Sequence, residues 1–243
     1  MNLVLFEPGE LEMPLSLADP RAQHILKVLR RAPGDTFVAG VVNGPHGVAT
    51  LLAHDTAAGA LTIAFAPTHE PPPLPPVTLL VGLPRPQTAR DLLRDATTLG
   101  VARIHFVATE RADPNYAASS LWTSGEWRRH VLAGATQACD TRLPEITWTH
   151  TLASALAALP SGASSRLALD NYEATAPLAS ALSGQIINHP SSIINPTVLA
   201  LGPERGWDAA DRAALRAAGF TLCSLGSRVL RLETAVVAAL AIV

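Results

Sequence analysis

Two glycines near the C-terminus, Gly202 and Gly226, each follow a short apolar run and open a polar turn. The two stretches read VLALGPERGW and TLCSLGSRVLRLETA, and each leads into a segment with helical character. Glycine lets the backbone turn sharply and lets a flat ligand approach without a Cβ in the way. Two such loops would offer peptide N–H and C=O groups to the edge of a purine. Glu204, Arg228 and Arg231 lie beside the loops and would add charge to such a site.

Several common ligand motifs are absent from the chain. LGPERG lacks the lysine and the spacing of GxxxxGK[ST], and no GxGxxG, GxSxG or HExxH occurs. The two cysteines, Cys139 and Cys223, belong to no CxxC or Cys/His cluster, so we expect reduced thiols and no metal site. An alternative interpretation of Gly202 and Gly226 is that they only punctuate strand–helix junctions.

Parallel strands would position these loops, because ligands bind outside the carboxyl ends of such strands. After residue 76 the sequence alternates between apolar runs and helical patterns, which predicts an α/β domain with a mainly parallel sheet. Strands are expected at residues 77–81, 104–108, 167–170, 198–201 and 221–225. Helices are expected at residues 88–99, 121–139, 152–159, 209–218 and 232–242. The last helix is apolar nearly all round and must be buried, within its own domain or against a second subunit.

The first 70 residues have a different pattern, which is typical of a small β-barrel. Short apolar or β-branched runs occupy residues 2–6, 36–42, 47–53 and 61–66. One helix interrupts them, with Asp19 as N-cap, Pro20 at its first position and Pro33-Gly34 at its end. Its expected buried residues are Ile25, Leu26, Val28 and Leu29. Its other residues include His24, Lys27, Arg30 and Arg31.

Composition bounds the class of protein. The chain has 243 residues, 48% hydrophobic and 16% charged, as expected for one large globular domain or two modest ones. The start MNLVLFEPGE lacks signal-peptide features, and no apolar run approaches the ~18 residues of a membrane span, so we expect a cytoplasmic protein. With a formal net charge of −2, any contact with nucleic acid must use local basic patches. The proline-dense stretch THEPPPLPPV, at residues 68–77, indicates a spacer.

The glycine loops also resemble a known signature. LGPERGW followed by LGSRVLRLETA is similar to the cofactor loops of the RsmE family of 16S rRNA uridine-N3 methyltransferases, which belong to the SPOUT class. HILKVLR, from His24 to Arg30, resembles the HxxxVLR element of that family. Further matches follow in order at Leu99-Gly100-Val101, Thr109-Glu110-Arg111, Gln137, Arg142 and Pro144. The chain departs from the family at Arg205, where glycine is usual, and at Asp95 and Thr98, where Arg85, Arg90 and Arg94 could compensate.

The resemblance implies a fold and a set of partners. The fold would be α/β, a SPOUT-type trefoil-knotted domain with a mainly parallel sheet, preceded by a small PUA-like β-barrel. Residues 1–70 would form the RNA-binding barrel, residues 71–76 a proline-rich linker and residues 77–243 the methyltransferase domain. The cofactor would be S-adenosylmethionine, with its adenine held by backbone groups. The partners would be 16S rRNA in the assembled small ribosomal subunit and a second copy of the chain, without metal or membrane.

The resemblance also implies which residues bind the cofactor, and the chemistry of methyl transfer and of RNA contact suggests further candidates. The cofactor residues would be Leu201, Gly202, Glu204, Gly206, Leu225, Gly226, Ser227 and Leu230. Uridine N3 is a poor nucleophile while protonated, so cations near O2 and O4 would assist, and the candidates are Arg228 and Arg231. Glu233 would orient an arginine or relay the proton. The RNA-binding residues would be His24, Lys27, Arg30, Arg31 and Arg85.

Other interpretations stay open at this stage. The arginines could form surface or dimer-interface ion pairs, Glu233 could be only a helix-start carboxylate, and the basic residues after Asp19 could be a solvated helix face. The enzyme could instead methylate another base or a ribose 2′-hydroxyl. A catalytically silent RNA-binding module with the same fold is the alternative from a different class, and cofactor binding would distinguish it.

Overall fold

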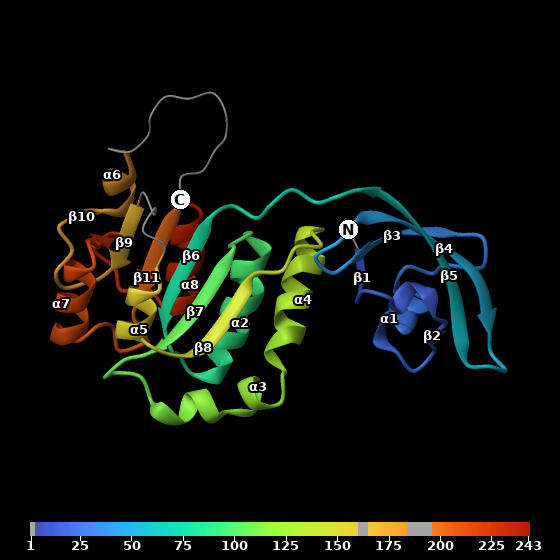
Figure 1. The fold of residues 1–243 in the computed structure, drawn as a ribbon, viewed down its shortest axis with the longest axis horizontal. Coiled ribbons are helices and arrows are strands. Elements are labelled where there is room, and N and C mark those ends of the chain that lie inside the picture. Colours follow the sequence, from blue (N-terminus) through green and yellow to red (C-terminus); the bar gives the residue numbers. More distant parts are fainter. Residues whose placement is uncertain (1–2, 160–164, 184–195) are drawn as a thin grey trace. The chain divides into compact units, whose positions relative to one another are not determined.

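The computed structural model describes residues 3–159, 165–183 and 196–243 (Figure 1). The sequence of residues 183–196 indicates a loop, and this segment lies outside the described residues except for its two ends. The chain divides into two compact units. The first comprises Met1–Pro73 and Leu132–Leu143, and the second comprises Leu74–Val131 and Pro144–Val243.

The first unit is built on a five-stranded sheet with the order β1-β3-β4-β5-β2. β1 pairs with β3 in parallel, and the other neighbours are antiparallel. All four strands predicted here are confirmed, whereas the two-residue strand β2 was not predicted. β5 continues to His69, so the irregular part of the proline-dense stretch begins after that residue. The strands are β1 (Val4–Phe6), β2 (Leu15–Ser16), β3 (Thr36–Val41), β4 (His46–Asp55) and β5 (Ala60–His69).

The predicted helix of the first unit begins where expected but is shorter. The Asp19 carboxylate accepts a hydrogen bond from the Arg21 amide at 2.8 Å, and Pro20 occupies the first position of α1 (Pro20–Gln23). A π-helical turn, η2 (His24–Val28), follows, and Arg30 then adopts a left-handed φ of 54°. The prediction that the helix extends to Pro33-Gly34 is therefore wrong. A short 3-10 turn, η1 (Glu10–Glu12), precedes this helix.

Only part of the predicted apolar side of this helix is buried. Ile25 is fully buried in the core of the first unit, and Leu26 and Leu29 pack against it. Val28 is 61% exposed, so its predicted burial is wrong. The π-helical turn accounts for this, because it adds a residue per turn and shifts the positions that face the core.

A second chain segment completes the first unit. Residues 132–143 include the C-terminal half of α4 (Trp127–Ala138), and they pack Leu132, Ala135, Cys139 and Leu143 around Leu3, Leu5 and Val42. The Asn43 amide donates to the Thr141 carbonyl at 2.8 Å, and the Thr141 hydroxyl donates to the Gly44 carbonyl at 2.6 Å. The first unit therefore includes residues that lie far beyond residue 73 in the sequence.

The second unit contains a seven-stranded sheet in which every neighbouring pair is parallel. Its order is β10-β12-β9-β11-β6-β7-β8, so β9 lies between the strands that lead into the two glycine loops. The predicted mainly parallel α/β domain is confirmed, although β8 and β10 were not predicted. The strands are β6 (Val77–Gly82), β7 (Arg103–Ala108), β8 (Glu145–Thr151), β9 (Ser165–Leu169), β10 (Ala176–Pro177), β11 (Thr197–Leu201) and β12 (Thr221–Ser224).

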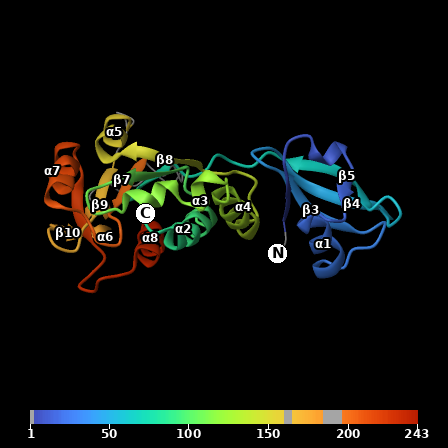
Figure 2. The same ribbon diagram turned by 90° about the horizontal axis from the view of Figure 1, so that it is seen from below.

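Helices cover both faces of this sheet (Figure 2). α2 packs against α8, and α5 packs against α7. The predicted helix at residues 121–139 is wrong as one element, because Gly125 has a φ of 77° and separates α3 from α4. Beyond α4 the helices of this unit are α2 (Pro86–Thr98), α3 (Ser120–Thr123), α5 (Leu152–Ala157), α6 (Leu178–Ser183), α7 (Ala209–Ala217) and α8 (Leu232–Leu240), with a 3-10 turn η3 (Pro114–Ala118).

The helix predicted at residues 209–218 is confirmed as α7, and it is capped at both ends. The Asp208 carboxylate accepts from the Asp211 amide at 2.6 Å, and the Asp211 carboxylate accepts from the Asp208 amide at 3.2 Å. Gly219 follows the helix with a φ of 82°. In α8 one face is buried, with Val236 and Ala239 inaccessible, and Val237 on the other face is 38% exposed. Among the described helices, none is long and apolar enough to cross a membrane.

Candidate functional site

Three loops at the carboxyl ends of neighbouring parallel strands line one cavity in the second unit. They follow β9, β11 and β12, and the cavity has a volume of about 610 Å³. The start of α2 and the first turn of α8 complete the wall. The two glycine loops therefore share a cavity, as their position at one edge of a parallel sheet predicts.

Most residues predicted for the site line this cavity. They are Leu201, Gly202, Glu204, Gly206, Leu225, Leu230, Arg228, Arg231, Glu233 and Arg85. Gly226 and Ser227 connect Leu225 to Arg228 in the same loop but do not themselves line the cavity. The four other predicted RNA-binding residues, His24, Lys27, Arg30 and Arg31, belong to the first unit.

The first glycine loop folds tightly on itself. A Cβ on Gly202 would lie 2.8 Å from the Gly206 carbonyl carbon and 2.9 Å from the Trp207 nitrogen. Trp207 is fully buried, and its indole N–H donates to the Leu169 carbonyl at 3.1 Å. Gly202 is thus required by the loop's own turn, and Trp207 ties that loop to the end of β9.

The second glycine loop is open. Gly226 has a φ of 110°, and no atom of the described residues lies within 4 Å of the position that a Cβ would take. Among the described residues, the peptide groups of residues 226–230 take part in no hydrogen bond with the rest of the protein. Peptide N–H and C=O groups are strong hydrogen-bonding groups that need partners. This loop can therefore offer a row of them to a ligand in the cavity.

The charged residues of the cavity differ in their pairing. The Glu204 carboxylate accepts from the Arg85 amide at 3.0 Å and from its guanidinium Nε at 3.3 Å, at the start of α2. Arg228 and Arg231 are exposed, and Glu233 is half-buried in the first turn of α8. Within the described part of the chain, these three residues form no ion pair. Two arginines are thus available to an anionic group in the cavity.

The arginines of α2 that could compensate for Asp95 and Thr98 are occupied. Arg90 forms two hydrogen bonds to the Glu126 carboxylate, at 2.9 and 3.1 Å. Arg90 and His130 donate hydrogen bonds that lower the pKa of Glu126 to about 2. Arg94 pairs with Asp95 at 2.9 Å and with Asp91 at 3.1 Å. Of the three arginines proposed for this surface, only Arg85 lines the cavity.

The third loop, which follows β9, was missed by the sequence reasoning. Leu169, Asp170, Asn171 and Tyr172 all line the cavity. The available signal was the same as for the glycine loops, because a polar Asp-Asn pair ends an apolar run at the carboxyl end of a predicted parallel strand.

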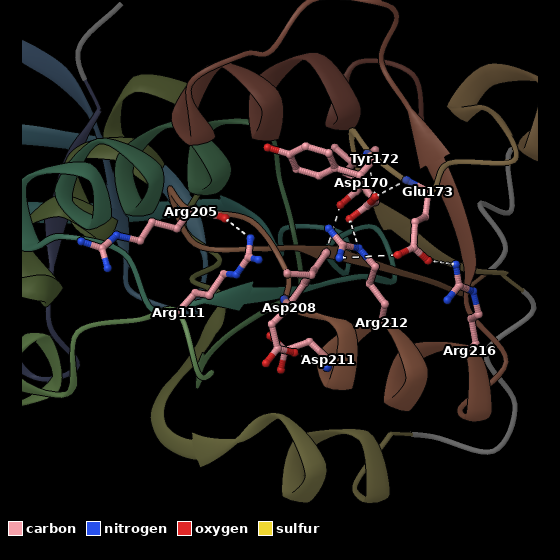
Figure 3. Close-up of polar contacts among 11 residues, drawn as sticks. Arg111, Asp170, Tyr172, Glu173, Arg205, Asp208, Asp211, Arg212 and Arg216 are labelled. Carbon is pink, nitrogen blue, oxygen red and sulfur yellow. Dashed lines mark hydrogen bonds and ion pairs between the residues drawn. The ribbon is translucent and has the colours of Figure 1, made fainter.

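A buried ion pair holds this third loop (Figure 3). The Arg212 Nε lies 2.7 Å from the Asp170 carboxylate, and the two side chains are only 8% and 2% exposed. The other Asp170 oxygen accepts from the amides of Tyr172 at 2.8 Å and Glu173 at 2.6 Å. Glu173 in turn pairs with Arg216 at 2.5 Å. The loop is therefore fixed to α7 by several charged contacts.

Two further observations concern Arg205 and Cys223. The Arg205 carbonyl accepts a hydrogen bond from Arg111 at 2.8 Å, and the exposed side chain of Arg205 lines a second hollow of about 550 Å³.

Cys223 lies in β12 and lines the main cavity, and burial raises the pKa of its thiol. Both cysteines are free thiols, as predicted.

Four basic residues of the first unit lie in the π-helical turn or just after it. Lys27, Arg30 and Arg31 are exposed, and His24 is half-buried. None of the four forms an ion pair with another described residue. The turn therefore presents a local concentration of positive charge.

Comparison with known proteins assigns the family. The family profile described as "RNA methyltransferase domain" matches residues 70–243. The ribosomal RNA small subunit methyltransferase E of Treponema pallidum is 34% identical over 251 residues, which cover 100% of this chain and 90% of the relative. The chain belongs to this methyltransferase family. A second member, from Borreliella burgdorferi, is 27% identical and is covered over 95% of its length, with 98% of this chain.

Solved structures agree with that assignment. The ribosomal RNA small subunit methyltransferase E of Neisseria gonorrhoeae, solved with S-adenosyl methionine, has a TM-score of 0.75 and 26% identity. The match covers 99% of this chain and 95% of that one. A putative methyltransferase from Legionella pneumophila shares the fold, with a TM-score of 0.74, 20% identity and coverage of 100% and 96%.

Proposed function

We propose that this protein transfers a methyl group from S-adenosylmethionine to N3 of a specific uridine in 16S rRNA. The observation that carries the proposal is the second glycine loop. It lines the cavity and, among the described residues, its peptide groups at residues 226–230 are unpaired and its two arginines form no ion pair. The family and the names of its members supply the reaction class.

The cavity has the donor set that this cofactor requires. Peptide groups of residues 228–230, which line the cavity, can bind the edge of an adenine, and the glycine at position 226 leaves open space where a side chain would stand. When bound, S-adenosylmethionine supplies an electrophilic methyl group. The cofactor contacts proposed from this arrangement are Leu201, Gly202, Glu204, Gly206, Leu225, Gly226, Ser227 and Leu230.

Arg228 and Arg231 are proposed to act on the uracil ring. Attack by N3 requires loss of its proton, which places negative charge on O2 and O4. A guanidinium held near these oxygens stabilises that charge, and it does so best in a site that excludes water. Glu233, in the first turn of α8, is proposed to orient one of these arginines or to accept the proton.

The finer fold and assembly are also part of the proposal. β11 lies between β9 and β6 while β12 lies on the other side of β9, an order compatible with the trefoil knot of the SPOUT class. We assign residues 1–70 to a PUA-like RNA-binding barrel, residues 71–76 to a linker and residues 77–243 to the methyltransferase domain. The exposed apolar residues Val237 and Ile242, near the end of the chain, support a homodimer. The substrate would be the assembled small subunit in the cytoplasm, and no metal would be required.

Nucleoside mass spectrometry tests the reaction. Small-subunit rRNA from a strain lacking the gene should lose one N3-methyluridine, and restoring the gene should return it. A lost 2′-O-methyl nucleoside or another methylated base would contradict the proposed target atom. Calorimetry with S-adenosylhomocysteine provides the second arm, because absence of binding at millimolar ligand would favour a silent RNA-binding module.

A further inference from the structure

Tyr172 combines two properties that seldom occur together. The residue is 76% exposed, yet it belongs to the loop that the buried Asp170–Arg212 pair fixes to α7. Among the described residues, Tyr172 and Val229 are the large hydrophobic residues that are both strongly exposed and part of the cavity wall. Tyr172 contributes little to the core, so packing does not explain an aromatic ring at this position.

One face of the ring meets a described cation. The Arg212 guanidinium lies 5.4 Å from its centroid, within the range of a cation–π contact. Because that guanidinium also binds the buried Asp170 carboxylate, its own position is fixed. Asp170 accepts from the Tyr172 amide as well, so the backbone and one face of the ring are restrained together (Figure 3). The residue is 76% exposed, so ring surface away from Arg212 is accessible to a ligand.

We propose that the accessible ring surface of Tyr172 is the stacking platform for the RNA base that is presented to the methyl donor. The inference rests on the proposed function and deepens it, because it identifies a residue that captures the base. Proteins recognise unpaired RNA bases by stacking them on aromatic side chains. A ring that is already fixed loses little conformational entropy when a base stacks on it.

The position of the ring favours the RNA base over the adenine of the cofactor. A small-molecule pocket buries most of its ligand, whereas Tyr172 remains largely exposed at the cavity wall. The base would enter between this loop and the loop that carries Val229, Arg228 and Arg231. Stacking on Tyr172 would orient the ring, and the arginines would contact its oxygens.

The test compares Tyr172→Leu, which keeps apolar volume but removes the ring, with Tyr172→Phe, which keeps the ring. Single-turnover methylation is measured against the concentration of small ribosomal subunits from a strain lacking the gene. Tyr172→Leu should raise the half-saturating concentration about tenfold, as expected for one lost base–aromatic stack, with a smaller change in maximal rate. Tyr172→Phe should restore most of this loss. Binding of S-adenosylhomocysteine and the melting temperature should stay unchanged in both variants.

Arg212→Lys tests the positioning role, because lysine keeps the charge opposite Asp170 but lacks the planar guanidinium under the ring. Alone it should raise the half-saturating subunit concentration, and in the Tyr172→Leu background it should add nothing. Arg212→Lys and Tyr172→Leu could each raise the half-saturating concentration, with the double variant showing both increases in full. In that case Arg212 does not act through the ring.

Four outcomes would overturn the inference. Half-saturation unchanged in Tyr172→Leu would remove the ring from RNA binding. If Tyr172→Leu also bound S-adenosylhomocysteine more weakly, the ring would be assigned to the cofactor's adenine instead. A wild-type protein that leaves the subunits unmethylated would overturn the proposed function together with this inference. Normal methylation by both wild type and Tyr172→Leu would overturn the inference alone.

Discussion

Arg231 immediately precedes α8, where its exposed side chain lines the cavity. Removing one preorganised charge contact to a transition state costs on the order of 3 kcal/mol, or roughly a hundredfold in rate. We therefore expect Arg231→Ala to methylate small subunits about a hundredfold more slowly in single turnover. Cofactor affinity should be retained, because the proposed contacts to the cofactor are mainly backbone groups.

Arg129→Ala is the matched control for the loss of an arginine. Arg129 lies on α4, its side chain is 75% exposed and it does not line the cavity, so its replacement should leave the rate unchanged. A wild-type rate in Arg231→Ala would remove this residue from the chemical step and leave Arg228 as the candidate.

Gly226 is required by conformation, because its φ of 110° is unfavourable for any residue with a β-branched side chain. Gly226→Val should distort the open loop and weaken binding of S-adenosylhomocysteine by about tenfold or more, measured by calorimetry. Gly59→Val is the control, because Gly59 has a φ of 67° in the turn between β4 and β5. It introduces the same kind of strain in the first unit and should spare cofactor affinity. Equal affinity for both variants and wild type would mean that Gly226 only marks the junction between β12 and α8 and does not shape the cofactor site.

At the scale of elements, the loop after β9 depends on a buried ion pair. Arg212→Met would leave the Asp170 carboxylate, which is 2% exposed, without its cation. Breaking a buried pair in this way typically costs about 3–5 kcal/mol. We expect the free energy of unfolding of the variant, measured in urea, to fall by an amount of that order.

Adding Asp170→Asn to Arg212→Met distinguishes charge from shape. The asparagine oxygen can still accept from the amides of Tyr172 and Glu173, while the uncompensated charge is gone. The double variant should therefore recover part of the lost stability. A double variant that is less stable than Arg212→Met alone would show that the carboxylate is tolerated without its partner.

The π-helical turn of the first unit leads to a prediction about RNA. Lys27 and Arg31 are exposed and form no ion pair with another described residue, so both can contact phosphate. Lys27→Gln/Arg31→Gln should weaken binding to small subunits and reduce the salt dependence of binding by up to about one unit per lost phosphate contact. Filter binding across a salt series measures this, with S-adenosylhomocysteine affinity as the control. An unchanged salt slope would identify these side chains as a solvated face.

Sequence patterns predicted most central elements, because a strand buried on both faces is a continuous apolar run. β6, β9 and β11 were found this way. β8 was missed because it lies at the edge of the sheet and reads EITWTHT, with threonine and histidine among its apolar residues. The break between α3 and α4 was missed because Ser124-Gly125 interrupts an otherwise helical pattern.

The cavity was only partly predictable. Its two glycine loops could be found from local sequence, since glycine marks a backbone requirement. The role of Arg212 could not, because its partner Asp170 lies 42 residues away and the pairing depends on the order of the strands. Nothing in the local pattern around Arg212 distinguishes it from the other charged residues of α7.

At the scale of the whole molecule, two histidines make stability depend on pH. Burial is the main cause that lowers the pKa of His105 in the second unit and of His46 in the first. Below the ordinary histidine pKa of 6.5 the unfolded chain binds protons at these side chains, whereas the folded chain binds them only at lower pH. Above about pH 7 the two histidines are neutral in both states and do not reduce stability. The folded state loses stability as the pH falls through the lowered pKa values.

Urea unfolding at pH 7.5, 6.5 and 5.5 checks this expectation. The free energy of unfolding of both units should decrease toward pH 5.5. His105→Gln should remove this pH dependence from the second unit. The carboxyl groups with lowered pKa, such as Glu126 and Asp19, titrate at lower pH and do not contribute in this window. A stability that is constant from pH 7.5 to 5.5 would contradict the assignment.

The strand order of the second unit also has a consequence for the newly made chain. β6 ends at Gly82, but one of its two neighbours, β11, begins only at Thr197. While the ribosome makes the intervening residues, β6 and β7 can pair, yet one edge of β6 has no partner. Unpaired strand edges are sites of intermolecular aggregation, and long-range parallel pairing is slow. An enzyme proposed to modify finished ribosomal subunits thus cannot close its own central sheet until translation is nearly complete.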